Sequence, residues 1–347
     1  MINQVRIYKD NLINNVKQVK TRNPNSLICA MVKANAYGVG DAEVVKSISD
    51  KVDFFGVACF FEAEKIKYYT DKEILIFGEL EKSCIDERFC YSCHSLDDVI
   101  FLVSLDKKIK IHISINTGMN RFGFCSKKEF KCALDLIKHS RLYLQGVYTH
   151  FATTDEFVDE QMSVFNEYIE ILHKEKFFPI IHADNSAVNK LYNHHLDMVR
   201  VGFDLYLNNV SPFLPVIEIG SRVVQINNVK VGQKVGYSNR YIAKEDCVIA
   251  VLPVGYADGL DMKLIGFEIV IDNVKCKIVN ICMDCCMIDV TNIKIKKEDF
   301  IFLVNADNSI SRYAKFLHTH EYEIMTRLSQ IRAERNLIFT DHCDWKY

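Results

Sequence analysis

Short apolar segments alternating with helical stretches are the feature that most restricts how this chain can fold. Near-continuous apolar strands joined by helical crossovers are typical of a parallel sheet covered on both faces. Eight such units are the number needed for a closed (β/α)8 TIM-like barrel. The pattern leaves an open, doubly wound sheet as the alternative. The eight expected strands are 27–33, 54–59, 74–77, 89–93, 110–115, 144–150, 179–184 and 198–203.

The pattern changes after the segment Val210-Ser-Pro-Phe-Leu-Pro215. Strand-like stretches punctuated by glycine, asparagine and aspartate follow, with one late helix expected at 312–329 and a last strand at 336–340. A helix is also expected at 7–20, ahead of the first barrel strand. We therefore predict an α/β protein with a barrel domain at 1–213 and a mostly-β domain at 214–347. The expected strands of the second domain are 216–227, 247–254, 267–271, 275–283, 286–290 and 300–304.

Charge and hydropathy exclude some classes of partner. The formal net charge of −2 over 347 residues gives no reason to expect nucleic acid or an anionic membrane surface. No apolar run is long enough for a transmembrane helix, and the first residues lack the apolar core of a signal peptide. A cytoplasmic protein is the resulting expectation.

The 13 cysteines allow two interpretations. Cys90 with Cys93 and Cys282 with Cys285 have the Cys-x-x-Cys spacing, and together they could supply four thiolates to zinc. Each pair lies in an apolar, strand-like segment, which favours reduced thiols that act as small hydrophobic residues. We expect no metal.

Lys33 follows the first apolar strand, and flexible residues follow it. Partial burial disfavours the ammonium form and lowers the pKa of a lysine, and such an amine can attack a carbonyl group. Tyr37 lies a few residues further on, and Gly38 and Gly40 allow a ligand to approach the backbone. On position alone, an ordinary solvated lysine at a strand end is the simpler interpretation.

Other polar side chains follow later strands, at the end of a barrel where functional residues gather. Taken singly, each histidine could be a hydrogen-bonded core residue and the second arginine a surface ion pair. The loops after strands seven and eight of a barrel commonly bind phosphate. These residues are Arg121, His150, His182, Ser186 and Arg200, with the backbone near Gly202 and Phe203.

The string Lys33-Ala-Asn-Ala-Tyr-Gly-Val-Gly40 resembles the pyridoxal phosphate (PLP) lysine segment of the alanine racemases, with Val39 where a histidine is usual. Further segments resemble the same family in the same order along nearly the whole chain. They are Thr117-Gly-Met-Asn-Arg-Phe-Gly123, Thr149-His-Phe-Ala-Thr-Thr-Asp155, His182-Ala-Asp-Asn-Ser186, Val251-Leu-Pro-Val-Gly-Tyr-Ala-Asp-Gly-Leu260, Ile281-Cys-Met-Asp284 and Glu321-Tyr-Glu-Ile-Met-Thr-Arg-Leu-Ser329.

The resemblance implies a fold-type III, PLP-dependent enzyme in which Lys33 carries the cofactor as an internal aldimine. Arg121 would contact the cofactor's phenolic oxygen and the substrate carboxylate, His150 would pack against the pyridine ring, and Arg200 would point at the ring nitrogen. An always-protonated guanidinium donates a hydrogen bond there without giving up a proton, which favours racemisation over transamination. At the phosphate the resemblance implies Tyr37, Ser186 and Tyr322, and the barrel rule adds the backbone amides near Gly202 and Phe203.

The segment Val235-Gly-Tyr237 resembles the family segment that bears the second base. Racemisation needs a proton donor and an acceptor on opposite faces of a planar intermediate. The resemblance assigns one face to Lys33 and the other to Tyr237, which would reach across from the second subunit of a homodimer. Tyr256 would narrow the entrance, and the Met283 backbone would contact the substrate carboxylate. The expected reaction is a two-base interconversion of L-alanine and D-alanine on the external aldimine, supplying D-alanine for peptidoglycan.

Three further positions, besides Val39, depart from the family pattern. Ser114 stands where many members carry a carbamylated lysine beside the arginine, Asn116 replaces an aspartate, and Cys285 replaces a glutamine. A bound chloride near Arg121 is one hypothesis for the missing carboxylate. Racemisation of serine or of several amino acids, and a non-catalytic PLP-binding protein, stay open as alternatives. A basic amino-acid decarboxylase fits less well, because it shares the lysine but not the Tyr-Gly and Gly-Tyr-Ala-Asp-Gly segments.

Overall fold

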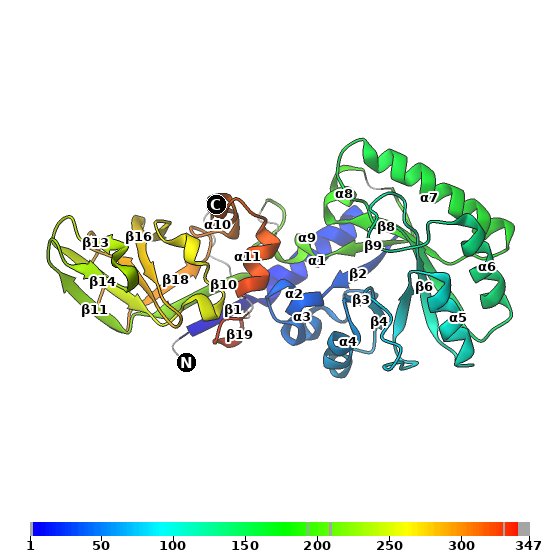
Figure 1. The fold of residues 1–347 in the computed structure, drawn as a ribbon, viewed down its shortest axis with the longest axis horizontal. Coiled ribbons are helices and arrows are strands. Elements are labelled where there is room, and N and C mark those ends of the chain that lie inside the picture. The colour runs from blue at the N-terminus through cyan, green and yellow to red at the C-terminus, as the bar shows by residue number, and fades with distance from the viewer. Residues whose placement is uncertain (1–2, 193, 208–209, 329, 339–347) are drawn as a thin grey trace. The chain divides into compact units, whose positions relative to one another are not determined.

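The computed structural model describes residues 3–192, 194–207, 210–328 and 330–338 (Figure 1). The chain divides into two compact units. The barrel unit contains Ile13–Ala36 and Val44–Leu205. The β-rich unit contains the described residues of Met1–Leu12, Tyr37–Glu43 and Tyr206–Tyr347. Two short segments from the N-terminal part of the chain thus belong to the unit formed mainly by its C-terminal part.

Eight parallel strands close into a barrel, because the last of them pairs with the first. This confirms the predicted barrel and rules out the open sheet. Three of the strands, β3, β5 and β9, are buried at every residue, as expected for parallel strands covered on both faces. In order, the strands are β2 (Leu27–Met31), β3 (Phe54–Val57), β4 (Glu73–Ile76), β5 (Cys90–Cys93), β6 (Lys110–Ser114), β7 (Tyr143–Tyr148), β8 (Ile180–Asn185) and β9 (Met198–Val201).

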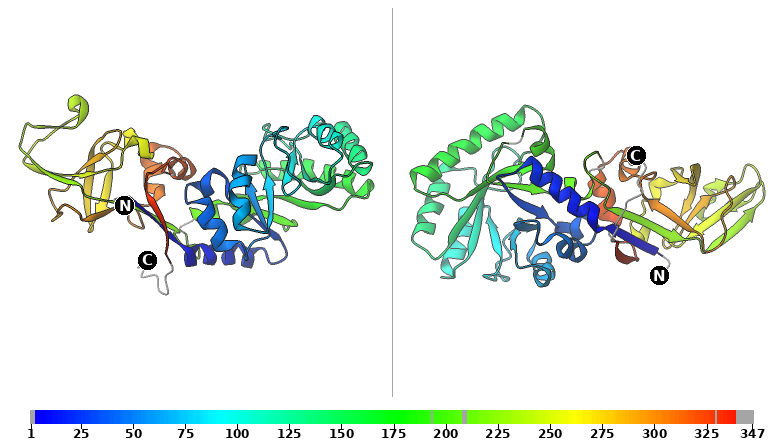
Figure 2. Two further views of the ribbon diagram at one scale, coloured as in Figure 1. Left: turned by 90° about the horizontal axis from the view of Figure 1, so that it is seen from below. Right: turned by 180° about the vertical axis from the view of Figure 1, so that it is seen from behind.

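Helices connect most of these strands, and α5, α6 and α7 lie on the outside of the barrel in Figures 1 and 2. The helix α6 buries Phe130, Ala133, Leu134 and Ile137, which lie on one face at helical spacing. The fully described connection from β4 to β5 contains no helix. The helices are α1 (Lys9–Arg22), α2 (Lys33–Tyr37), α3 (Asp41–Ile48), α4 (Phe60–Ile66), α5 (Leu96–Ser104), α6 (Lys127–Lys138), α7 (Phe157–Lys174), α8 (Ser186–Leu191) and α9 (Phe203–Tyr206).

The β-rich unit contains a four-stranded sheet, a five-stranded sheet and a two-stranded sheet. The four-stranded sheet has the order β18–β10–β1–β19, with bounds Phe300–Val304, Ile217–Arg222, Asn3–Tyr8 and Glu334–Ile338. The five-stranded sheet has the order β11–β14–β17–β16–β15, with bounds Gln225–Val229, Cys247–Leu252, Cys286–Asp289, Val274–Ile281 and Glu268–Ile271. The two-stranded sheet pairs β12 (Lys234–Val235) with β13 (Tyr241–Ile242). After β18, the chain forms two helices, α10 (Ile310–Leu317) and α11 (Glu321–Leu328).

Several boundaries differ from the expectations. Residues 7 and 8 end the strand β1, so the first helix begins at Lys9. The expected strand 216–227 is split between β10 and β11. The expected helix 312–329 is two helices, because His318 takes a left-handed conformation (φ 52°) that ends α10. Ser329 and Thr340, the last residues of two expected elements, lie outside the described residues.

Candidate active site

Lys33 stands at the start of an unusual turn. The strand β2 ends at Met31, and the residues after Lys33 have left-handed backbone angles: φ is 53° at Ala34, 55° at Asn35, 50° at Ala36 and 58° at Tyr37. This conformation costs roughly 1–2 kcal/mol for each residue that has a Cβ atom. Such a run persists only where its surroundings fix it, and one fixing contact is the Ala36 N–H donating to the Val32 carbonyl at 2.8 Å.

The amine of Lys33 lies in a cationic environment. Burial lowers its pKa first, Arg121 and Arg200 lower it further, and the Glu62 carboxylate acts in the opposite direction. This direction agrees with the expectation from the sequence. An amine that loses its proton more readily is a better nucleophile and a better base near neutral pH.

Arg200, on β9, is buried and held by several hydrogen bonds. It is 4% exposed and donates to His182 Nδ1 and to the carbonyls of Thr149 and Ala183, each at 2.8 Å. The same guanidinium lies 3.2 Å from His150 Nδ1. Carbonyl and imidazole acceptors hold the arginine without neutralising it, so its charge remains in the site.

The histidines around Arg200 are neutral. Burial and the charge of Arg200 lower the pKa of His150 to about 3 and that of His182 well below its ordinary value. Because His182 accepts a hydrogen bond at Nδ1, its proton lies on Nε2, which is 2.8 Å from His112 Nδ1. A two-histidine chain thus fixes the position of the guanidinium.

The loops after β8 and β9 meet at Ser186. Its hydroxyl oxygen lies 3.3 Å from the backbone N–H groups of Gly202 and Asp204, on either side of Phe203. Converging amides and a hydroxyl group are the donors that a phosphate needs. The barrel rule predicts a phosphate site at this place.

Arg121 follows β6 and is exposed. Across the described ranges it forms no ion pair with a carboxylate. Ser114 is buried and pairs in register with Tyr148 of β7, whose hydroxyl lies 3.0 Å from that of Ser92. None of these three hydroxyl groups supplies a negative charge that could compensate Arg121.

In the β-rich unit, three tyrosines lie together. The ring of Tyr37 lies 5.4 Å from that of Tyr206 and 5.7 Å from that of Tyr322, between ring centroids. Tyr37 comes from the left-handed turn and Tyr322 from α11. The structure thus brings together the two tyrosines predicted at the phosphate, and it adds Tyr206.

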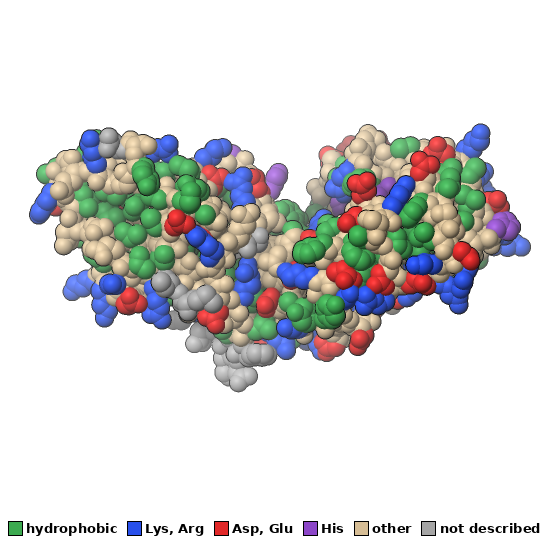
Figure 3. All heavy atoms as spheres, turned by 60° about the horizontal axis from the view of Figure 1, so that its bottom comes forward, with side chains coloured by type: hydrophobic (Ala, Val, Ile, Leu, Met, Phe, Trp, Pro, Cys, Tyr) green, Lys and Arg blue, Asp and Glu red, His purple; other side chains and the backbone are tan. Residues whose placement is uncertain are grey.

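Three further predicted residues of this unit are exposed. Tyr237 is 75% exposed, and its backbone is held by the Asn280 side-chain amide, which donates to the carbonyls of Val235 and Tyr237 at 3.1 and 3.3 Å. Tyr256 and Met283 lie on two segments that bond to each other, because the N–H groups of Tyr256 and Ala257 donate to the carbonyls of Cys282 and Met283 at 3.0 Å. Figure 3 shows hydrophobic side chains gathered on one face of the β-rich unit.

Sequence reasoning did not single out His112, Tyr148 or Glu62. His112 and Ser114 are two residues apart on β6, so their side chains lie on the same face of the strand. That periodicity was the available signal for His112. Nothing in the sequence pointed to Glu62. One of its contacts is the backbone N–H of Ala34, which follows a different strand and is distant in the chain.

Three further findings concern metal ligands, cysteine thiols and membrane-spanning helices. The described residues contain no group of three or more His, Cys, Asp or Glu side chains arranged to hold a metal ion. Every cysteine in the described segments is a free thiol, and several are not buried. Among the helices of the described chain, none is long and apolar enough to cross a membrane.

Comparison with known proteins shows where this fold occurs. The N-terminal domain family of alanine racemase matches residues 7–210, and the C-terminal domain family matches residues 216–337. An alanine racemase of Francisella philomiragia is 32% identical over 359 residues, covering 94% of this chain and 98% of the relative. A solved alanine racemase of Clostridium difficile 630 is 27% identical, with a TM-score of 0.91 over 99% of this chain and 97% of the other.

A second solved structure, the alanine racemase of Bacillus anthracis with bound L-Ala-P, is 28% identical, with a TM-score of 0.90 over 97% of this chain and 95% of the other. Both domain families match in the expected order and together cover most of the sequence. The chain belongs to the alanine racemase family.

Proposed function

We propose that this protein is a PLP-dependent alanine racemase that interconverts L-alanine and D-alanine. The arrangement around Arg200 carries the proposal: a buried guanidinium, held by neutral histidines, lies near a lysine of lowered pKa at the carboxyl ends of the barrel strands. Membership of the family and the likeness to an alanine racemase solved with bound L-Ala-P support it.

The residues present fit the cofactor. Lys33 would hold its aldehyde carbon, and the Ser186 hydroxyl with the amides around Phe203 would bind its phosphate. Tyr37 and Tyr322 would join at that phosphate, His150 would lie against the ring, and the Arg200 guanidinium would donate to the ring nitrogen. The two arginines near Lys33 suit an anionic group.

The bound cofactor makes the α-proton of an attached amino acid acidic, and residues of the chain then move that proton. Lys33 would take or return the proton on one face. Arg121 binds the substrate carboxylate, which orients the α-carbon. Arg200 would donate a hydrogen bond to the ring nitrogen and keep its own proton, so it would not make the ring a strong electron sink, which favours return of the proton to carbon.

Tyr237 serves the second face in this proposal. It is exposed on the single chain, which suits a side chain that completes the site of a second copy. The proposal therefore includes a homodimer, with Tyr256 and Met283 lining the entrance. A narrow entrance suits a small amino acid, and D-alanine for peptidoglycan is the proposed product. A cytoplasmic location and the domain boundary at 213/214 stay predictions.

Proton NMR of L-alanine in deuterated water, with purified enzyme, added PLP and chiral analysis of the product, tests the proposal. We expect loss of the α-proton signal together with formation of D-alanine. Loss of the signal without D-alanine would mean that one face lacks a working base, and would count against Tyr237 or the dimer. No loss with alanine but loss with serine would favour the broader racemase. No loss with any amino acid, in an enzyme that binds PLP, would favour the non-catalytic binding protein.

A further inference from the structure

One carboxylate joins the ends of the first two barrel strands. Glu62, in the first turn of α4, accepts a hydrogen bond from the Ala34 N–H at one oxygen and from the Ala58 N–H at the other, both at 2.7 Å. Ala34 follows Lys33 directly, and Ala58 follows the neighbouring strand β3. Since β2 and β3 pair in parallel, the carboxylate spans two adjacent strand ends.

Both bonds are of the strong kind. A hydrogen bond from a backbone amide to an ionised carboxylate is short and roughly twice as strong as one between neutral partners. The bond to Ala34 lies at the first residue of the left-handed run, where the chain leaves the direction of β2. That run is unfavourable for residues with a Cβ atom, so a strong contact at its first residue helps to hold it.

The same carboxylate acts on the amine of Lys33. The charged and titratable groups around that amine are the guanidinium groups of Arg121 and Arg200, the carboxylate of Glu62, and His150, which burial keeps neutral. Glu62 is the anionic member of this set. It opposes the two arginines and so limits how far the pKa of Lys33 is lowered.

We propose that Glu62 is a positioning residue for Lys33: its carboxylate fixes the left-handed turn that sets the direction of the lysine, and it supplies negative charge beside the amine. The electrostatic half of this inference rests on the proposed function of Lys33 as the cofactor lysine. The backbone half concerns the turn alone and does not depend on the cofactor.

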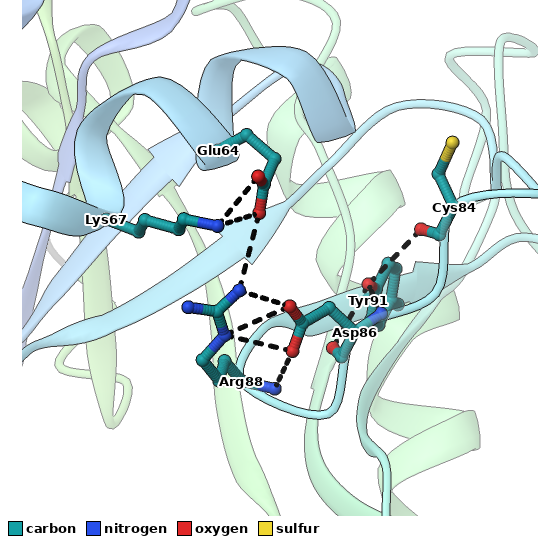
Figure 4. Close-up of polar contacts among 6 residues, drawn as sticks. All are labelled: Glu64, Lys67, Cys84, Asp86, Arg88 and Tyr91. Atoms are coloured by element: carbon teal, nitrogen blue, oxygen red, sulfur yellow. Dashed lines mark hydrogen bonds and ion pairs between the residues drawn. The ribbon is translucent and has the colours of Figure 1, made fainter.

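The matched control lies two residues along the same helix. Glu64 pairs with Lys67 at 2.6 Å and with Arg88 at 3.6 Å, in the surface cluster drawn in Figure 4. It is not among the groups that act on Lys33. Glu64→Gln therefore removes a carboxylate charge from α4 while leaving the turn and the amine unaffected.

The first measurement is the rate at which added PLP attaches covalently to the full-length protein, as a function of pH. The bond is trapped with borohydride and located by mass spectrometry. Attack requires the neutral amine, and Glu62 favours the ammonium. We expect the profile of Glu62→Gln to move to lower pH by about one pKa unit, the scale on which a close charge acts. Glu64→Gln should match the wild type, and Glu62→Asp, which keeps the charge, should stay close to it.

The second measurement is hydrogen exchange of the peptides containing Ala34 and Ala58, followed by mass spectrometry without PLP. A glutamine has one oxygen acceptor for the two amides, so exchange in Glu62→Gln should be faster there than in Glu64→Gln. If Glu62→Gln does not fold, Glu62→Asp serves instead, because its shorter side chain cannot reach both amides.

The outcomes separate the two proposals. Identical pH profiles and identical exchange in Glu62→Gln and Glu64→Gln would overturn the inference. Faster exchange with an unmoved pH profile would overturn its electrostatic half. If the wild type forms no bond at Lys33, the proposed function fails, and the exchange data still decide whether Glu62 holds the turn.

Discussion

Replacing Tyr237 with phenylalanine gives the sharpest test of the proposed chemistry. The substitution removes one hydroxyl group from a side chain that is 75% exposed, so we expect the free energy of unfolding to change by less than about 0.5 kcal/mol. A general acid or base contributes typically 10²–10⁴ in rate. We therefore expect kcat for racemisation to fall by about that factor, which corresponds to roughly 3–5 kcal/mol of transition-state stabilisation.

The assay follows each enantiomer of alanine separately in deuterated water. If Lys33 still works on its own face, one enantiomer should keep exchanging its α-proton while the opposite enantiomer no longer forms. A non-catalytic PLP-binding protein would show no difference between the variant and the wild type. This asymmetry is a stronger readout than a lower rate, because a general loss of structure would reduce exchange of both enantiomers together.

Tyr241→Phe is the matched control, four residues further along the chain. The Tyr241 hydroxyl donates to Asp289 at 3.2 Å, so its loss should cost about 1 kcal/mol of stability and leave kcat unchanged. Light scattering on both variants checks that assembly is unaltered. A Tyr237→Phe enzyme that racemises within about tenfold of the wild-type rate would refute the assignment of the second base.

Four further predictions follow from the same contacts. Arg200→Lys should lose about 1–3 kcal/mol of stability in urea denaturation, because one ammonium nitrogen replaces the two guanidinium nitrogens and leaves at least one buried acceptor without a donor. A loss below about 0.5 kcal/mol would contradict this. In Gly255→Ala, the new Cβ would lie 2.3 Å from two backbone oxygens of the turn that carries Met283. The variant should therefore lose about 1–3 kcal/mol of stability in thermal unfolding and show a raised KM for alanine. An unchanged KM would contradict this. Burial raises the pKa of Asp258, but hydrogen bonds from Arg332 outweigh burial and lower it overall. The stability that this pair contributes should therefore be present above the ordinary carboxylate pKa and be lost as pH drops below it. Asp258→Asn should be less stable than the wild type at neutral pH and should lack that loss at low pH. Parallel plots of unfolding free energy against pH for the two proteins would count against the pair. Crystals soaked in bromide should show an anomalous peak beside Arg121, and a site holding only water would end the halide hypothesis.

The alternation of apolar strands and helices predicted eight strand–helix units, which fit a closed barrel, and the change to a β-rich region. These features depend on local periodicity and strand count, which the chain carries residue by residue. The pairing of β9 with β2, which rules out the open sheet, was seen only in the tertiary structure. Boundaries were less accurate: one expected helix became α10 and α11 because a single residue, His318, adopts a left-handed conformation. Local patterns do not record where a backbone will take such an angle.

The predicted site residues of the barrel unit followed from strand ends, because the carboxyl ends of parallel strands meet at one face. Their roles stay predictions, and the surroundings that support those roles were not visible in the sequence. The neutral state of His182 depends on burial and on Arg200, which lies eighteen residues away in the chain. The position of Lys33 depends on Glu62, a residue on another helix.

The sequence by itself determined which elements form, in what order, and which reactive side chains stand at their ends. Only the tertiary structure decided which of these side chains are buried, what they contact, and hence how readily each takes or keeps a proton. The physical reason is that secondary structure follows from neighbours in the chain, whereas burial and charge act between groups that are close in space and far apart in sequence.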